Sequence, residues 1–396
     1  MAIGFQARAR ARNAYAAGAR ATASGVNSIA WGVEANASGL NSMAIGVKAK
    51  ATHFEGTAIG PSAFASGKNA FAMGPGARAE GVNAFAVGVN ATAIGDDSFC
   101  ISDNCLDDAN SINSLTEGVD AHSIGSSAAI TLGAYAETMM TDSGIAIGTH
   151  AKTAFTDNAI AMGRNSLSRA SNAMAYGTNA RARVGSDNAI AMGHNAISNH
   201  VNAASFGSNA NANGLNSLAI GTAAKAQGTN TQASGANARA IGFNAVAQGT
   251  DAVAEGRNVI AIGTGAKAFG YNTNVVSIGA DGFADGTNVV ALGPASRAVG
   301  VNGLAFGSDA RAEGTNVTAM GPSAWATGTA STAIGPKAFA FGVQALSVGA
   351  YSSAEVDYAS AFGPGASARG FGSTAIGMNA VTTRPFEVSL GSAASP

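Results

Sequence analysis

The residues with the clearest capacity for chemistry are acidic side chains gathered between Gly95 and Gly118. Clustered carboxylate and amide oxygens are the ligands that Ca²⁺ prefers, and they can also hydrogen-bond to a receptor. The spacing is not that of an EF-hand. We therefore predict a protruding loop that contacts a receptor, with Ca²⁺ binding and a plain solvated insertion as alternatives. The candidate contact residues are Asp96, Asp97, Asp103 and Asn104.

A second candidate surface combines aromatic and arginine side chains, which recur at fixed spacing late in the chain. Aromatic and arginine residues dominate the energetically important positions of binding interfaces, and sugar rings stack on aromatic faces. The sequence therefore predicts a surface that binds a cell-surface glycan or a protein receptor, with plain scatter or packing against a neighbouring protein as alternatives. Its residues are Phe283, Arg297, Arg311, Trp325 and Phe339, with Phe341 beside the last.

Evidence for catalysis is weak. Asp281 and Asp285 flank Phe283 and could form the paired carboxylates of a glycan-cleaving enzyme, but nothing nearby supports them. Glycine-rich stretches such as "GTGAKAFG" are similar to phosphate-binding loops only superficially, because no helix follows them. We predict that the protein is not an enzyme and that it carries no cofactor and no metal ion.

Composition excludes several partners. The formal net charge is −1, and no basic run is long enough to follow a phosphate backbone, so we expect no nucleic acid partner. No apolar stretch reaches the length of a membrane-spanning helix, and "MAIGFQARARARNAYAAG" lacks the apolar core of a signal peptide. We therefore expect synthesis in a cytoplasm and no membrane insertion. Cys100 and Cys105 could pair with each other, but maturation in a cytoplasm favours reduced, buried thiols.

The elements that must position these residues follow from glycine, which recurs every seven residues over most of the chain. A helix is excluded because each interior glycine would cost about 1 kcal/mol. Residues between the glycines alternate with period two, as strands require. Successive sevens differ, so two strands and two corners form one coil of fourteen residues. The sequence predicts an all-β parallel β-roll, or solenoid, of about 27 such coils.

The two strands of a coil differ in the face that they turn outward. Small residues alternate inward in both strands, for example Ser42 and Ala44 in the first and Ala49 and Ala51 in the second. The outer face of the second strand is polar, whereas that of the first forms a continuous apolar stripe. A stripe of this size needs a cover, and no segment of the chain offers one, so we predict an obligate homo-oligomer closed around it. The predicted interface residues are Ile29, Trp31, Met43, Ile45, Phe71, Met73, Leu218, Ile220, Ile260, Ile262, Leu304 and Phe306.

The repeated phrases resemble a known family. "NSMAIG", "NSLAIG" and "NAIAMG", each followed by a segment of the form A-x-A-x-G, are similar to the YadA-like head repeat of trimeric autotransporter adhesins. The resemblance covers nearly the whole chain, and "RPFEVSLG" is similar to the last strand before the neck of that family. It implies a trimeric, left-handed parallel β-roll. We expect the protein to lack the secretion signal, neck, coiled-coil stalk and outer-membrane anchor of the family. Phage tail and head fibres, which use similar repeats, need none of them.

We accordingly predict three segments: regular coils over residues 1–95, an irregular region with insertions and bulged corners over 96–206, and regular coils over 207–396. The function predicted from the sequence is that of a homotrimeric fibre of a phage virion, which attaches to a host surface or acts as a rigid spacer. Its partners would be other virion proteins and a host glycan or protein, and it would reside in the virion. The alternative is the head of a bacterial adhesin at the cell surface, binding host matrix or cells.

Overall fold

A computed structural model describes residues 1–270 and 274–392 of the chain. These residues form 55 strands and no helix, so within this part of the chain no helix is long and apolar enough to cross a membrane. The chain divides into two compact units, Met1–Asn202 and Ala203–Pro396. The last four residues of the predicted third segment lie outside the described residues.

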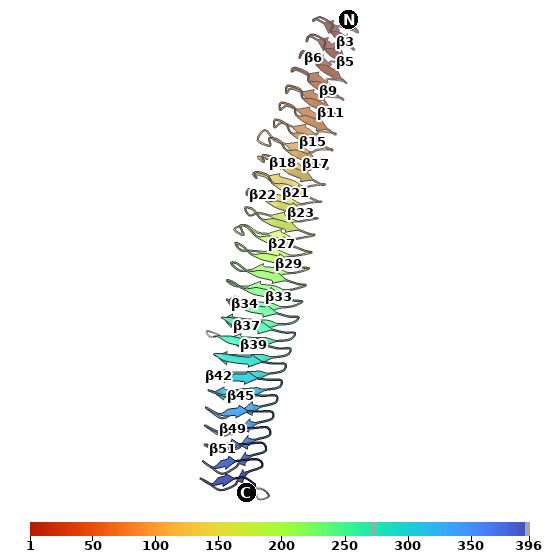
Figure 1. Cartoon of the computed structure of the whole chain (residues 1–396). Helices are drawn as coiled ribbons and strands as arrows, with labels where there is room; N and C mark the ends of the chain where they lie inside the picture. The colour runs from red at the N-terminus through yellow and green to blue at the C-terminus, as the bar shows by residue number, and fades with distance from the viewer. Residues whose placement is uncertain (271–273, 393–396) are drawn as a thin grey trace. The chain divides into compact units, whose positions relative to one another are not determined.

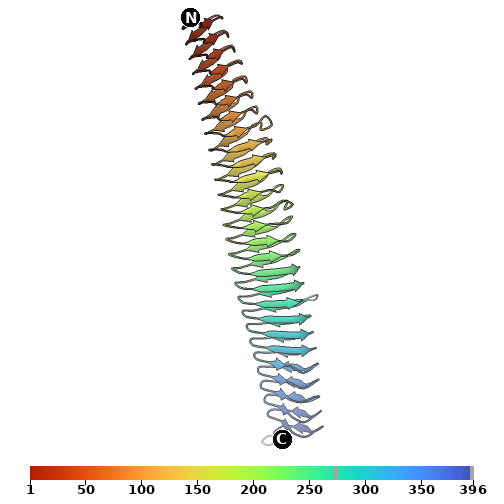
Figure 2. The same cartoon turned by 180° about the vertical axis from the view of Figure 1, so that it is seen from behind.

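Within each unit the strands stack in parallel, each pairing with the strand one coil away, as the stacked arrows of Figures 1 and 2 show. Odd-numbered strands form the first sheet and even-numbered strands form the second. The chain is therefore an all-β parallel β-solenoid, and 28 strands belong to the first sheet, against the roughly 27 coils that the sequence predicts.

In the first unit both sheets consist of strands of two or three residues. The first-sheet strands are β1 (Ala2–Ile3), β3 (Tyr15–Ala17), β5 (Ile29–Trp31), β7 (Met43–Ile45), β9 (Thr57–Ile59), β11 (Phe71–Met73), β13 (Phe85–Val87), β15 (Phe99–Ile101), β17 (Leu115–Glu117), β19 (Ile130–Leu132), β21 (Ile145–Ile147), β23 (Ile160–Met162), β25 (Met174–Tyr176) and β27 (Ile190–Met192). The second-sheet strands are β2 (Arg8–Ala9), β4 (Thr22–Ala23), β6 (Asn36–Ala37), β8 (Lys50–Ala51), β10 (Phe64–Ala65), β12 (Arg78–Ala79), β14 (Thr92–Ala93), β16 (Leu106–Asp107), β18 (His122–Ile124), β20 (Glu137–Met139), β22 (Lys152–Ala154), β24 (Leu167–Ser168), β26 (Arg181–Ala182) and β28 (Ile197–Ser198).

In the second unit some strands lengthen to four or five residues. The first-sheet strands are β29 (Ala204–Phe206), β31 (Leu218–Ile220), β33 (Gln232–Ser234), β35 (Val246–Gln248), β37 (Val259–Ile262), β39 (Val275–Ile278), β41 (Val289–Leu292), β43 (Leu304–Phe306), β45 (Thr318–Met320), β47 (Thr332–Ile334), β49 (Leu346–Val348), β51 (Ser360–Phe362), β53 (Thr374–Ile376) and β55 (Val388–Leu390). The second-sheet strands are β30 (Asn211–Asn213), β32 (Lys225–Gln227), β34 (Arg239–Phe243), β36 (Val253–Arg257), β38 (Lys267–Gly270), β40 (Phe283–Thr287), β42 (Arg297–Val301), β44 (Arg311–Thr315), β46 (Trp325–Ala326), β48 (Phe339–Ala340), β50 (Ser353–Ala354), β52 (Ser367–Ala368) and β54 (Val381–Thr382).

The coil interior is built almost entirely from small side chains. Ala44, Ala49 and Ala51 are fully buried and Ser42 nearly so, which confirms the predicted sorting of faces. Because each alanine offers little apolar area, the interior gains less free energy per residue than a core of leucine or isoleucine would. Most larger side chains lie outside the coil, on one sheet or the other, whereas Val259, Val275, Val289 and Val317 are fully buried inside it.

The corners show why glycine recurs and where the sequence analysis was incomplete. At Gly46 the backbone has a φ of 132°, and an added Cβ would strike the backbone of Gly60 in the next coil. At most corners, however, a further residue also adopts the left-handed conformation, and asparagine, which tolerates it well, is the commonest type there. These asparagines form ladders: the amide of Asn13 donates to Asn27 over 3.0 Å, and Asn27 donates to Asn41 over 2.9 Å.

The segment between Gly95 and Gly118 continues the solenoid, so its interpretation as a protruding loop is wrong. Phe99 pairs with Leu115 in the first sheet, sixteen residues on, and Leu115 pairs with Ile130. The additional residues widen one corner, around Asn110, without breaking either sheet. Because the strands of this segment pair in parallel with the strands of the coils before and after it, the segment remains part of the solenoid.

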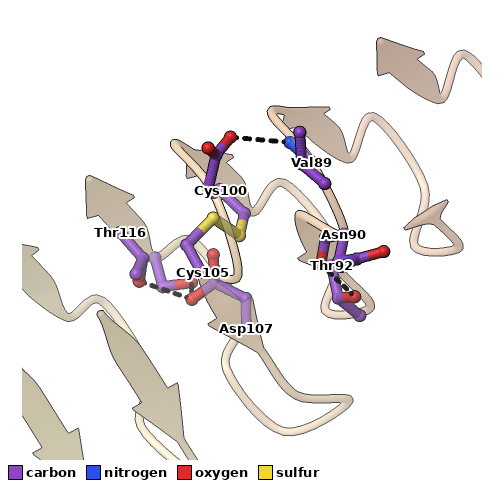
Figure 3. Close-up of a disulfide and its surroundings, with 9 residues drawn as sticks. Val89, Asn90, Thr92, Cys100, Cys105, Asp107 and Thr116 are labelled. Carbon is purple, nitrogen blue, oxygen red and sulfur yellow. Dashed lines mark hydrogen bonds between the residues drawn. A yellow bond between two sulfur atoms is a disulfide. The ribbon is translucent and has the colours of Figure 1, made fainter. Parts of the chain in front are cut away.

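The interior of these longer coils is polar and contains a disulfide. Cys100 and Cys105 lie at inward positions of one coil with their Cα atoms 5.8 Å apart, and the structure joins them in a disulfide, contrary to the expected reduced thiols (Figure 3). This separation is within the range that a disulfide requires.

Asp107 is also fully buried, and its Oδ1 accepts hydrogen bonds from Ser114 (2.9 Å) and Thr116 (2.8 Å). Burial raises the pKa of the Asp107 carboxyl to about 7, although these hydrogen bonds lower it.

Candidate binding surface

The predicted aromatic and arginine residues form one row on the outer face of the second sheet. Phe283 of β40 pairs with Arg297 of β42, which pairs with Arg311 of β44. Arg311 in turn pairs with Trp325 of β46, and Trp325 with Phe339 of β48. The alternation of strand residues points all five side chains away from the coil interior. We refer to these five residues and Phe341 as the aromatic row.

Adjacent side chains of the aromatic row contact one another. The Arg297 guanidinium lies 4.5 Å from the centre of the Phe283 ring, and that of Arg311 lies 5.4 Å from the Trp325 ring, which are cation–π distances. Phe341 meets Trp325 edge-on at 5.3 Å and stacks on Phe339 at 5.8 Å between ring centroids. These contacts hold the rings in fixed orientations, so that a ligand would meet a surface that is already ordered.

Only some polar groups of the aromatic row form hydrogen bonds or ion pairs within the protein. Arg297 donates through Nε to Glu313 over 2.8 Å. Arg311 has no carboxylate partner among the described residues, and the Trp325 indole N–H is buried without an acceptor. The Arg311 guanidinium, which is exposed, can therefore donate hydrogen bonds to a bound molecule.

The structure does not bring the predicted acidic residues into one site. Asp96 and Asp97 lie at one corner of a coil, whereas Asp103 and Asn104 lie at the corner on the other side of β15. Each of the four accepts a hydrogen bond from the preceding coil, and the bond to Asn104 is the longest. The bonds run from Val82 N–H to Asp96 (2.7 Å), Asn83 to Asp97 (2.8 Å), Val89 N–H to Asp103 (2.8 Å) and Asn90 to Asn104 (3.3 Å). Over the described ranges, no group of three histidine, cysteine or acidic residues is placed to hold a metal ion.

The twelve predicted interface residues all lie on the outer face of the first sheet. Several are largely exposed in the single chain, including Trp31 (60%) and Phe306 (51%), and others such as Ile260 are half-buried. Phe71 stacks on Phe85 of the next coil, with 4.9 Å between the ring centroids. The apolar side chains therefore cover one another along the stack, but their outward surfaces, facing away from the coil, stay uncovered. We refer to this face as the apolar stripe. Its pairing with a second copy stays a prediction.

Sequence reasoning missed a basic groove on the second sheet of the first unit, over β22, β24 and β26. Lys152 is paired there with Glu137 at 2.9 Å, while Arg169 and Arg181 are exposed. The signal was hard to find because the coils here contain fourteen, fifteen or sixteen residues, which removes the fixed spacing that revealed the aromatic row.

Comparison with known proteins places these features in a family. The model of the YadA head domain repeat matches most of the chain, over residues 9–35, 37–53, 54–77, 79–99, 142–166, 157–180, 185–210, 201–224, 212–238, 226–245, 233–258, 240–266, 298–324, 326–352 and 357–380. The chain belongs to the YadA head repeat family. Among solved structures, it is similar to the collagen-binding domain of the Yersinia adhesin YadA, with 24% identity, 43% of this chain and 69% of that chain covered, and a TM-score of 0.24. No curated protein matches the chain.

Membership of the YadA head repeat family agrees with what the geometry offers. The β-solenoid and the head repeat are structural rather than catalytic, and the chain is an adhesin-type head.

Proposed function

We propose that this chain is the head of a homotrimeric fibre, in which the first sheets of three copies face one another and the second sheets face outward. The observation that carries the proposal is the apolar stripe, where side chains as large as Trp31 and Phe306 remain more than half exposed in the single chain. Burying a side chain of this kind is worth roughly 1.5–3 kcal/mol, and a soluble monomer rarely leaves such a continuous patch uncovered. The repeat family supports the same assembly.

The outward second sheet then provides the contact surface, and the aromatic row is its most specific part. Rings held in place by Arg297 and Arg311 present apolar faces of the size of a sugar ring. The exposed guanidinium of Arg311 supplies donors for hydroxyl or carboxylate groups. This combination favours a cell-surface glycan or a glycosylated protein as the ligand.

A paired set of variants tests the binding role. Trp325→Ala with Phe339→Ala removes two rings of the aromatic row, whereas Ser353→Ala with Ser367→Ala changes the same row one and two coils further on. The aromatic pair should weaken binding to target cells and to a glycan array at least about thirtyfold, since interface aromatics contribute 2 kcal/mol or more. The serine pair should bind like the unchanged chain. Equal binding by all three proteins would refute the assignment.

The head could be part of a phage virion, which the sequence suggested first, or of a bacterial cell surface. The family match supports both locations equally. Both lie outside the cytoplasm, where the disulfide between Cys100 and Cys105 would persist. Mass spectrometry of purified virus particles and of bacterial envelopes from the native source separates them. Peptides around Trp325 in the particles support a virion fibre, and the same peptides in the envelope support a cell-bound adhesin.

A further inference from the structure

A shallow basic groove crosses the outer face of the second sheet in the first unit, far along the chain from the aromatic row. It lies over β22, β24 and β26, on a face that stays open to solvent in the proposed trimer. Lys152, Leu167 and Arg181 occupy successive positions of one row, as the strand register shows. The groove is lined chiefly by His150, Lys152, Asn165, Leu167, Arg169 and Arg181.

The groove carries positive charge that the protein itself does not neutralise. Arg169 and Arg181 have no carboxylate within ion-pair distance among the described residues, and the same is true of Arg164 and Arg183 at the corners before β24 and after β26. The nearest acid on this face is Glu137, which pairs with Lys152.

The acidic residues at the corner that follows these strands, next to Arg169 and Arg183, form no ion pair with the arginines. Asp157 accepts a backbone hydrogen bond from Asp142, and Asp187 accepts one from Ser171 at 3.1 Å. Guanidinium groups without partners on one open face attract sulfate, carboxylate or phosphate groups and bind them with two parallel hydrogen bonds.

The arrangement of the cations suits a polymer rather than a single ion. Stacked strands lie about 4.8 Å apart, so Lys152 and Arg181, two coils apart, place charges about 10 Å apart along the stack. The asparagine ladder lies beside them, and Asn165 donates to Asn179 over 3.2 Å. Charges repeated along the stacking direction match charges repeated along a linear polyanion.

The floor of the groove distinguishes between classes of polyanion. Leu167 lies half-buried between the cationic side chains and presents an apolar surface to the apolar C–H face of a sugar ring. No phenylalanine, tyrosine or tryptophan lines the groove, whereas surfaces for single-stranded nucleic acid usually offer aromatic rings for base stacking. We infer that this groove binds a linear acidic polysaccharide carrying sulfate or carboxylate groups. This site is independent of the aromatic row and of the trimer.

The test uses the full chain and three immobilised probes: heparin, which is sulfated, hyaluronan, which carries carboxylates alone, and double-stranded DNA. Binding is measured by surface plasmon resonance over a range of salt concentrations. Arg169→Gln with Arg181→Gln removes two charges from the groove. The matched control, Lys225→Gln with Arg239→Gln, removes two charges from the second sheet of the other unit.

We expect the unchanged chain to bind heparin, hyaluronan or both, and the groove variant to lose at least about tenfold in affinity with a shallower salt dependence. The control should lose less than twofold, and circular dichroism should show all three proteins equally folded. Equal losses in both variants would overturn the inference, because binding would then follow total charge. No binding to either polysaccharide, or tighter binding to DNA than to both, would also overturn it.

Discussion

Replacing Gly214 with alanine should separate two neighbouring coils, whereas the same replacement at Gly303 should be tolerated. An added Cβ at Gly214 would overlap the carbonyl oxygen of Gly228 and lie 2.6 Å from the Gly228 nitrogen, closer than real Cβ atoms approach. At Gly303 the nearest atom is Cγ1 of Val289, at an ordinary 3.5 Å. Neither glycine has a φ in the left-handed region, so the two substitutions differ only in the space available.

The magnitude follows from the contacts that must yield. Overlap of this kind costs roughly 1–3 kcal/mol. Moving the coils apart also weakens inter-coil hydrogen bonds such as that from Asn230 N–H to the Leu215 carbonyl (2.9 Å), each worth about 0.5–1.5 kcal/mol net. We expect Gly214→Ala to destabilise its coil interface by about 3–5 kcal/mol. Gly303→Ala should stabilise by about 0.4–1 kcal/mol, because it restricts the unfolded chain.

Hydrogen exchange followed by mass spectrometry is the appropriate assay, because solenoid coils contact only their neighbours and a defect should remain local. Peptides that include Gly214 and Gly228 should lose protection in Gly214→Ala and keep it in Gly303→Ala, at equal protein concentrations. Protection unchanged in Gly214→Ala, or lost equally in both variants, would refute the argument that backbone contact between coils requires glycine.

Three further perturbations test other parts of the molecule. Between pH 4 and pH 7 the unfolded chain ionises Asp107 while the folded chain keeps its proton, so stability should fall with rising pH by up to about 4 kcal/mol. Urea titrations at several pH values should show this slope, and Asp107→Asn should flatten it. Reducing the bond between Cys100 and Cys105 should cost about 2 kcal/mol, seen as a lower melting temperature, and Cys100→Ala with Cys105→Ala should make the chain indifferent to reductant. Ile260→Asp with Ile262→Asp should abolish the trimer in sedimentation velocity, whereas a trimer of unchanged stability would show that the apolar stripe is not the interface.

The fold could be predicted from the sequence because two periodicities agree. Alternation of period two defines strands, and the glycine spacing places each corner, so the inward position of Ala44 and the outward position of Met43 follow without further information. The aromatic row could be found in the same way, since its coils all contain fourteen residues and pair directly.

The remaining features depend on register or on contacts between coils. The left-handed position of Asn41 is occupied in other coils by residues such as Glu55, so residue type alone does not reveal it. The basic groove requires knowing which strands pair where coils contain unequal numbers of residues. The burial of Asp107 is against the ordinary preference of aspartate, and only the pairing of β16 with β14 and β18 places it inside.

The mass of the intact chain in solution tests the central claim most directly. Sedimentation equilibrium at several protein concentrations should give a single species of three chains, each of 38.6 kDa, because the apolar stripe of each copy is covered by the others. A folded monomer that persists across these concentrations would contradict the account, since it would show that the chain tolerates Trp31 and Phe306 exposed to water.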